Sequence, residues 1–94
     1  MQDKKTAREE REELFRLILS LKTVEDCDDL FADLCTNKEL EQMAQRVVAA
    51  RLLLEGKTYT QVTELLDISP ATLSRVSRCV QYGNGYARLI QKKS

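Results

Sequence analysis

Apolar side chains recur along this chain at steps of three and four residues, which is the spacing of one face of an α-helix. Three such runs occupy residues 7–21, 23–35 and 36–54, and the charged opening of the first is expected to face solvent. Residues 1–6 carry no packing pattern. The period-two alternation of a half-buried strand is missing throughout. The pattern therefore predicts an all-α protein.

The run over residues 36–54 is apolar over a wide arc and carries few charges in its middle. We therefore expect a long core helix that is buried on more than one side. Thr36 begins a capping box that would open this helix, and Gly56 stops it. Its arginines, Arg46 and Arg51, are expected at the surface, although in a dimer they could also project toward a ligand or a phosphate.

Residues 58–81 predict a helix, a tight turn and a second helix. Thr58 begins a capping box for the first helix, while Ser69 is a preferred N-cap and Pro70 stands at the first position of the second. At about 100° per residue, the second helix has two different sides. One side is mostly apolar and holds Leu73, Val76, Ser77 and Val80. The other is small, hydroxylic and basic and holds Ala71, Ser74, Arg75 and Arg78.

The second of these sides suits a duplex groove, because small residues permit close approach and arginine binds guanine or phosphate. The predicted DNA-binding residues on this helix are Ser69, Pro70, Ala71, Thr72, Ser74, Arg75 and Arg78. Residues expected on the phosphate side are Lys57, Thr58 and Thr60. A solvated helical hairpin is the alternative, and we favour DNA binding because the Ser-Pro entry, the split sides and the low acidity coincide.

Residues 84–91 predict a short sixth helix. Gly83 is expected to end the preceding helix in the left-handed conformation. Packing in the core is expected for the apolar and aromatic residues of this region, which are Tyr82, Tyr86, Leu89 and Ile90, although the hydroxyl of either tyrosine could instead contact DNA. The length of 94 residues corresponds to a single domain, which as a monomer would bury only a modest core. An intertwined dimer would bury more apolar surface.

The net charge of zero conceals an uneven distribution. Residues 1–41 hold 12 acids and 7 bases, whereas residues 42–94, which include the helix pair, hold 3 acids and 8 bases. The cysteines lack C-x-x-C spacing, so we expect reduced core thiols and neither a disulfide framework nor a metal site. These cysteines are Cys27, Cys35 and Cys79.

Other function classes have little support in the sequence. With no histidine and no evident base beside a nucleophile, we expect neither an enzyme nor a metal or organic cofactor. The charged N-terminus and the lack of a long apolar run predict a cytoplasmic protein without a membrane partner.

The ordered motifs T-N-K-E-L-E-Q-M-A-Q-R-V, L-L-L-E-G-K-T and L-L-D-I-S-P-A-T-L-S-R resemble the Trp repressor family, most closely its YerC/YecD-type members. The resemblance covers residues 36–83. It implies a six-helix fold with a helix-turn-helix and an intertwined homodimer. Residues 7–57 would then form the dimerisation helices, 58–81 the helix-turn-helix and 84–91 the C-terminal helix.

The resemblance also identifies positions that match the ligand pocket of tryptophan-responsive members: Thr36, Arg46, Thr72 and Arg75. Two further positions depart from that pattern, because Val76 replaces a glycine and Cys79 replaces a serine. The valine adds side-chain volume where the ligand would lie, at a cost of about 1–3 kcal/mol. We therefore predict that tryptophan does not bind; no other small-molecule effector is indicated.

The leading hypothesis is a homodimeric repressor that binds double-stranded DNA in a sequence-specific manner. The alternative is a helical protein-interaction and dimerisation module without DNA binding, in which the acidic N-terminal helix docks a partner and the helix pair is only a scaffold. The zero net charge favours this alternative.

Overall fold

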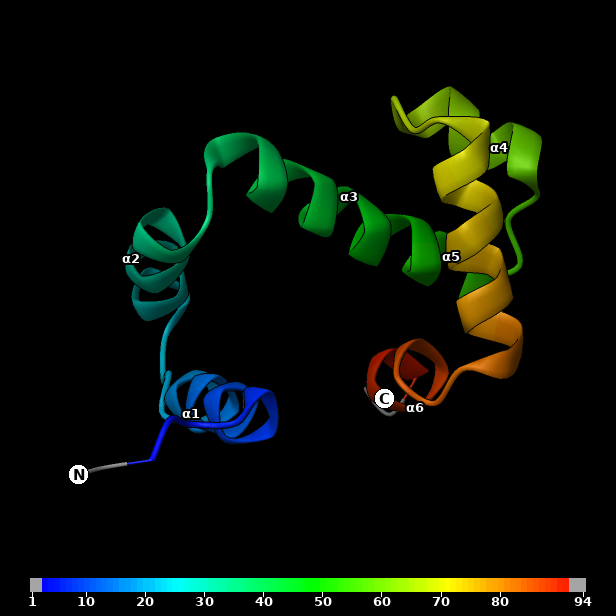
Figure 1. Cartoon of the computed structure of the whole chain (residues 1–94). Helices are drawn as coiled ribbons and strands as arrows, with labels where there is room; N and C mark the ends of the chain where they lie inside the picture. Colours follow the sequence, from blue (N-terminus) through cyan, green and yellow to red (C-terminus); the bar gives the residue numbers. More distant parts are fainter. Residues whose placement is uncertain (1–2, 92–94) are drawn as a thin grey trace. The chain divides into compact units, whose positions relative to one another are not determined.

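The computed structural model describes residues 3–91, which form six α-helices and no strand. The helices are α1 (Ala7–Leu19), α2 (Val24–Leu34), α3 (Asn37–Leu54), α4 (Tyr59–Leu65), α5 (Pro70–Tyr82) and α6 (Tyr86–Gln91) (Figure 1). None of these six is long and apolar enough to cross a membrane. The all-α prediction is confirmed. Contacts between Cα atoms divide the chain into unit 1, Met1–Thr36, and unit 2, Asn37–Ser94, and each is described by itself.

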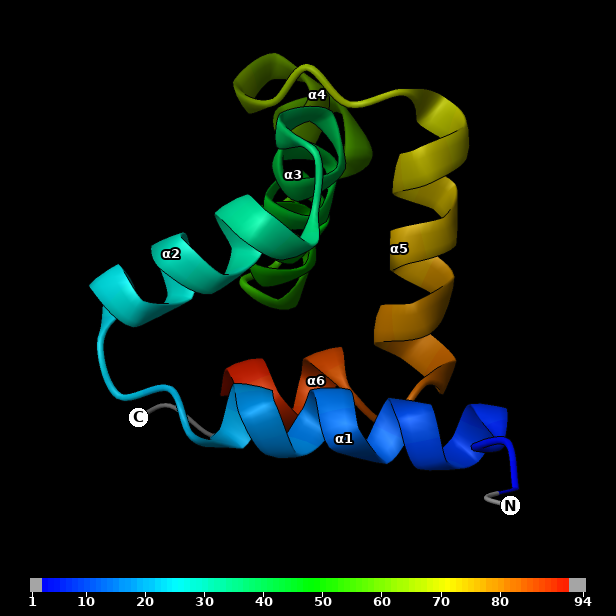
Figure 2. The same cartoon turned by 60° about the vertical axis from the view of Figure 1, so that its left-hand side comes forward.

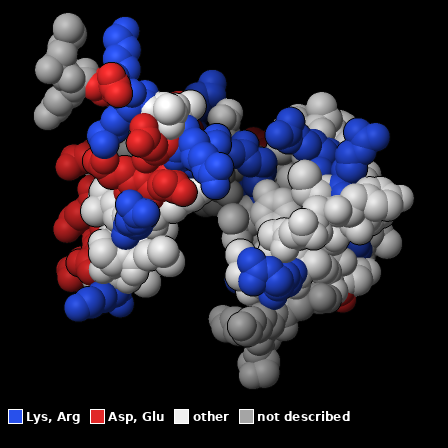
Figure 3. Space-filling model, turned by 60° about the horizontal axis from the view of Figure 1, so that its bottom comes forward, with Lys and Arg blue, Asp and Glu red and all other residues white. Residues whose placement is uncertain are grey.

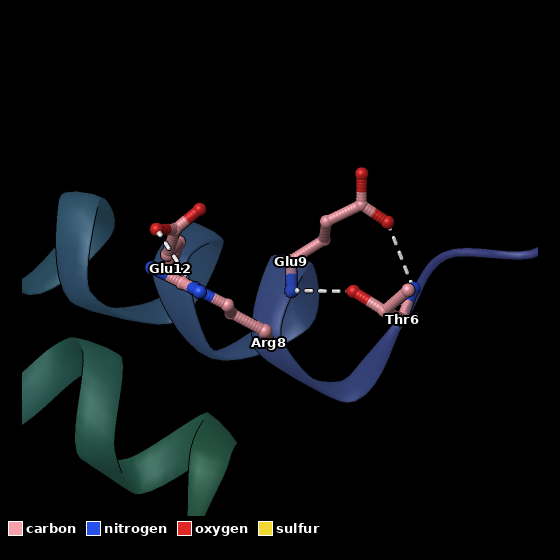
Figure 4. Close-up of polar contacts among 4 residues, drawn as sticks. All are labelled: Thr6, Arg8, Glu9 and Glu12. Atoms are coloured by element: carbon pink, nitrogen blue, oxygen red, sulfur yellow. Dashed lines mark hydrogen bonds and ion pairs between the residues drawn. The ribbon is translucent and has the colours of Figure 1, made fainter.

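Unit 1 begins with a capping box that fixes the start of α1. The Thr6 side-chain oxygen accepts a hydrogen bond from the Glu9 amide at 3.1 Å, and a Glu9 carboxylate oxygen accepts one from the Thr6 amide at 2.8 Å (Figure 4). An exposed ion pair between Arg8 and Glu12 spans 3.9 Å and adds little stability. At the start of α2, Thr23 is the N-cap, and its side-chain oxygen accepts a hydrogen bond from the Asp26 amide at 2.9 Å.

Neither α1 nor α2 contains a buried residue. Their apolar stripes are at most half-buried, and several large side chains are mainly exposed in the single chain. Leu19 is 83% exposed and Val24 is 87% exposed. Unit 1 thus presents apolar surface that the isolated chain leaves open to solvent.

Unit 2 begins with α3, which ends where the glycine was predicted to stop it. Gly56 has a φ of 95°, in the left-handed region that glycine adopts at low cost. The Lys57 amide donates to the Leu52 carbonyl at 3.0 Å, and the Gly56 amide donates to the Leu53 carbonyl at 3.0 Å. These bonds satisfy carbonyls that a helix end otherwise leaves without partners.

The core of unit 2 lies where α3 packs against α5, and α4 and α6 contact α3 as well. In Figures 1 and 2, α4 and α6 lie near opposite ends of α5. The buried core residues are Ala49, Ala50, Val62, Ile68, Leu73 and Val76. These side chains come from three helices and from the turn before α5. The packing therefore fixes the inner side of α5.

The long helix α3 is only partly covered in the single chain. Ala49 and Ala50 are fully buried, whereas Val47 and Val48 are 43% and 40% exposed. Burial on more than one side was the prediction for this helix. Within the described chain, the side that carries the two valines stays accessible.

Candidate nucleic-acid interface

The helix-turn-helix of unit 2 is built from the capping residues that the sequence predicted. Thr58 and Gln61 form the capping box of α4, with hydrogen bonds of 2.9 and 3.1 Å. Ser69 caps α5, because its hydroxyl oxygen accepts a hydrogen bond from the Thr72 amide at 3.1 Å, and Pro70 occupies the first turn. The turn between the helices is anchored by Ile68, which is buried in the core.

Helix α5 has one inner and one outer side, as the pattern predicted. Leu73, Val76 and Ser77 are buried. The predicted groove-side residues Ala71, Ser74, Arg75 and Arg78 are all exposed. The helix contains two arginines and no acidic residue. Its outer side is therefore accessible, basic and held in place by the core behind it.

The capping residues at the start of α5 have local hydrogen bonds of their own. The Ser69 hydroxyl donates to the Thr72 hydroxyl oxygen at 2.9 Å, in addition to accepting from the Thr72 amide. Thr72 is half-buried, whereas Ser69 and Pro70 are exposed. The phosphate-side residues Lys57, Thr58 and Thr60 are exposed around the start of α4. All ten predicted DNA-binding residues therefore lie in unit 2, and Thr72 is the least accessible of those on α5.

An open hollow of about 590 Å³ lies along the outer side of α5. The groove-side residues Ala71, Ser74, Arg75 and Arg78 line it together with Ser77, Tyr59, Gln81 and Tyr82. The sequence interpretation missed Tyr59 and Gln81, and it gave Tyr82 a DNA contact only as the alternative to core packing. Tyr82 lies four residues after Arg78, so helical spacing already placed it on the same side. Tyr59 belongs to α4 and reaches the hollow only through the packing of the two helices.

The structure corrects three expectations for the end of α5 and for α6. Core packing was predicted for Tyr82 and Leu89, but these residues are 81% and 60% exposed. Tyr86 and Ile90 do pack against the core. Gly83 has a φ of −86° and not a left-handed conformation. A Cβ atom at Gly83 would lie 2.7 Å from the Cys79 carbonyl oxygen, so close approach explains this glycine.

The residues that match the tryptophan pocket do not share one environment. Val76 is 1% exposed and belongs to the core of unit 2, whereas Arg75 points outward and is exposed. Arg46 is half-buried on α3, and Cys79 is exposed, not a core thiol as predicted. Thr36 lies in unit 1.

Cys79 lines a second hollow of about 570 Å³, next to the loop that joins α5 to α6. The lining is mostly apolar, and its other residues are Val47, Gly83, Asn84, Gly85, Tyr86, Leu89 and Ile90. Val47 and Leu89 are among the exposed large hydrophobic residues of the chain. This hollow therefore continues the open apolar side of α3.

Charge is distributed unevenly over the surface. Helix α2 contains five acids and no base. Figure 3 shows acidic side chains gathered over the part of the molecule that carries α1 and α2, while basic side chains predominate on the visible face of unit 2. The outer side of α5 therefore belongs to the basic part of the chain.

Comparison with known proteins gives consistent matches over most of the chain. The family model described as Trp repressor protein matches residues 9–94. The chain is 48% identical over 84 residues to the "Uncharacterized protein YerC" of Bacillus subtilis (strain 168), a match that covers 89% of this chain and 81% of that protein. A crystal structure of a TrpR-like protein from Eubacterium eligens ATCC 27750 has a TM-score of 0.82 and 43% identity, over 86% of this chain and 84% of that one. The structure of a Staphylococcus aureus protein, 38% identical, also has a TM-score of 0.82, over 86% of this chain and 82% of that one.

Proposed function

The chain belongs to the Trp repressor family, as its motifs predicted, and we propose that it is a homodimeric repressor that binds double-stranded DNA through its helix-turn-helix. One observation carries this proposal. The outer side of α5 is exposed, contains two arginines and has no acid, while the opposite side is buried against α3. Such a helix can enter a major groove without losing its place in the core.

The outer side offers each type of contact that a duplex needs. Arg75 and Arg78 supply the charge and the planar donors that bind guanine edges or phosphates. Ala71 and Ser74 are small, so the helix can approach the base edges closely. Tyr82 is exposed and lines the hollow, and its hydroxyl suits a phosphate oxygen. Lys57 and Thr60 would bind phosphates of the DNA backbone beside α4.

Dimerisation is supported by apolar surface that a single chain leaves open. The exposed side chains include Leu19 and Val24 in unit 1 and Val47 and Val48 on α3. Burial of apolar area against a second copy would contribute about 25 cal/mol per Å². A two-fold symmetric pair would present two α5 helices to successive major grooves, with half-sites about 34 Å apart.

The regulator we propose does not respond to tryptophan. Val76 stands where tryptophan-responsive members have a glycine, and its side chain is already packed in the core of unit 2. A ligand at that position would have to displace the side chain or shift α5, at a cost of about 1–3 kcal/mol. Arg75, exposed on the outer side, is then available for DNA.

Binding to random duplex over a range of salt concentrations tests the proposal. The affinity should fall steeply as salt rises, because phosphate contacts release counterions. Sedimentation of the free protein should give the mass of a dimer, twice 10.8 kDa. A stable monomer, or a chain that binds no duplex at low salt, would refute the proposal.

A second candidate function is favoured by α2, which carries five acids and no base. In that case the acidic helices would dock a protein partner and α4 and α5 would serve as a scaffold. Heparin chromatography at low salt separates the two candidates. A DNA-binding protein should be retained, whereas an adaptor with this charge should flow through.

A further inference from the structure

The turn between α4 and α5 is held from outside the helix pair. A Gln45 side-chain nitrogen on α3 donates a hydrogen bond to the Asp67 carbonyl oxygen at 2.6 Å. The two residues are 22 positions apart, whereas each capping bond at Thr58 and Ser69 joins residues 3 positions apart. This contact therefore ties the turn to a different element of the fold.

Gln45 lies on a part of α3 that is anchored in the core, so its side chain can hold the turn before α5. It is half-buried, and it lies one turn before Ala49, which is fully buried in the core. On the other side of the bond, Asp67 lies next to Ile68, which the core holds, and two residues before the cap of α5 at Ser69. The bond therefore links the anchored part of α3 to the segment from which α5 starts.

From this geometry we propose that Gln45 is a positioning residue for DNA binding: its amide fixes the turn and with it the direction of the outer side of α5. The proposal rests on the DNA-binding function proposed above. Gln45 itself need not touch DNA. Its effect passes through the turn, because an α5 helix that can tilt presents Arg75 and Arg78 in several directions and binds a groove less tightly.

The test compares Gln45→Glu with Gln42→Glu in the full chain. Both substitutions add one negative charge on the same helix, three residues apart, and Gln42 is exposed. Only the first removes a hydrogen-bond donor from the Asp67 carbonyl and places a carboxylate beside it. Because both variants carry the same added charge on α3, a difference between them reports the change at the Asp67 carbonyl, where a donor is lost and an acceptor takes its place.

We expect the Gln45 variant to bind duplex DNA about 2- to 12-fold more weakly per recognition helix than the Gln42 variant, the range that one net hydrogen bond represents. The slope of affinity against salt should be the same in both, because the number of phosphate contacts does not change. A role in stability alone would lower the melting temperature without loosening the turn. Nuclear magnetic relaxation of the free proteins, recorded equally far below the melting temperature of each variant, should show greater backbone motion at Ile68 and Ser69 in the Gln45 variant.

Equal affinities and equal turn motion in the two variants would overturn the positioning role. If the wild-type chain binds no duplex, the proposed function fails, and relaxation of the free proteins then decides the role of Gln45 alone. In that case, a turn that is rigid in the wild type and in the Gln42 variant but mobile in the Gln45 variant would show that Gln45 fixes the turn, although not for DNA binding. A turn with unchanged motion in all three proteins would exclude this effect of Gln45.

Discussion

Replacing both arginines on the outer side of α5 with alanine should weaken DNA binding and flatten its salt dependence. Arg75 and Arg78 are exposed, and both line the hollow along α5. Neither belongs to the buried core of unit 2. The double substitution therefore removes charge from the proposed interface without opening a cavity.

The size of the effect follows from the number of charges in the proposed dimer. Each single substitution removes two positive charges per dimer, and each lost phosphate contact lowers the salt slope by about 0.9. One substitution should then reduce the slope by about 1.8, and the pair by about 3.6. Between 50 and 200 mM salt, the wild type should lose about 12-fold more affinity than a single variant and roughly 150-fold more than the double variant.

Fluorescence anisotropy of a labelled duplex, measured at several salt concentrations, gives these slopes. Arg88→Ala is the matched control, because Arg88 is exposed on α6 and does not line the hollow on α5. It removes the same charge from the same basic half of the chain. If the double variant kept the wild-type slope, or if Arg88→Ala lowered the slope as much as Arg75→Ala or Arg78→Ala, the assignment of α5 as the contact surface would be refuted.

Three further predictions concern the pocket, the cap and the core. Calorimetry should detect no saturable binding of L-tryptophan, because Val76 is packed in the core at the position proposed to match a glycine of tryptophan-responsive members. Binding at micromolar levels would contradict this. Ser69→Ala should lower the free energy of unfolding by about 1 kcal/mol through the lost N-cap, as measured by denaturation at fixed protein concentration. Ser69→Asp should keep the cap but weaken duplex binding, as measured by anisotropy. Equal DNA affinity for Ser69→Asp and wild type would remove Ser69 from the interface. Leu73→Ala should lower the unfolding free energy by about 2–5 kcal/mol because this side chain is fully buried, and a loss below 1 kcal/mol in urea denaturation would show that the inner side of α5 is not the core.

The local signals in this sequence predicted local structure well. The Ser69–Pro70 pair determines where α5 begins, and the left-handed Gly56 determines where α3 ends. Each depends on hydrogen bonds and backbone angles within a few residues, which sequence pattern encodes directly. The same capping pattern was present at Thr6 and Glu9 and was overlooked.

Features that depend on distant residues were harder to predict. The contact between Gln45 and Asp67 joins segments whose proximity follows only from the packing of α3 with the helix pair. Tyr82 was assigned to the core because it is aromatic, although its helical position places it beside Arg78 on the outer side. Gly83 was predicted to adopt the left-handed conformation that glycine allows. The structure shows a different reason for the glycine, because a Cβ atom there would lie too close to the Cys79 carbonyl oxygen.

The central claim is that two copies of this chain hold two α5 helices at the spacing of the DNA helix. Selection of bound sequences from a random duplex pool by the full chain tests it most directly. The enriched sequences should contain an inverted repeat whose half-sites are centred about 34 Å apart, one turn of B-form DNA. Recovery of an unenriched pool, or of a single motif without a symmetric partner, would contradict the claim.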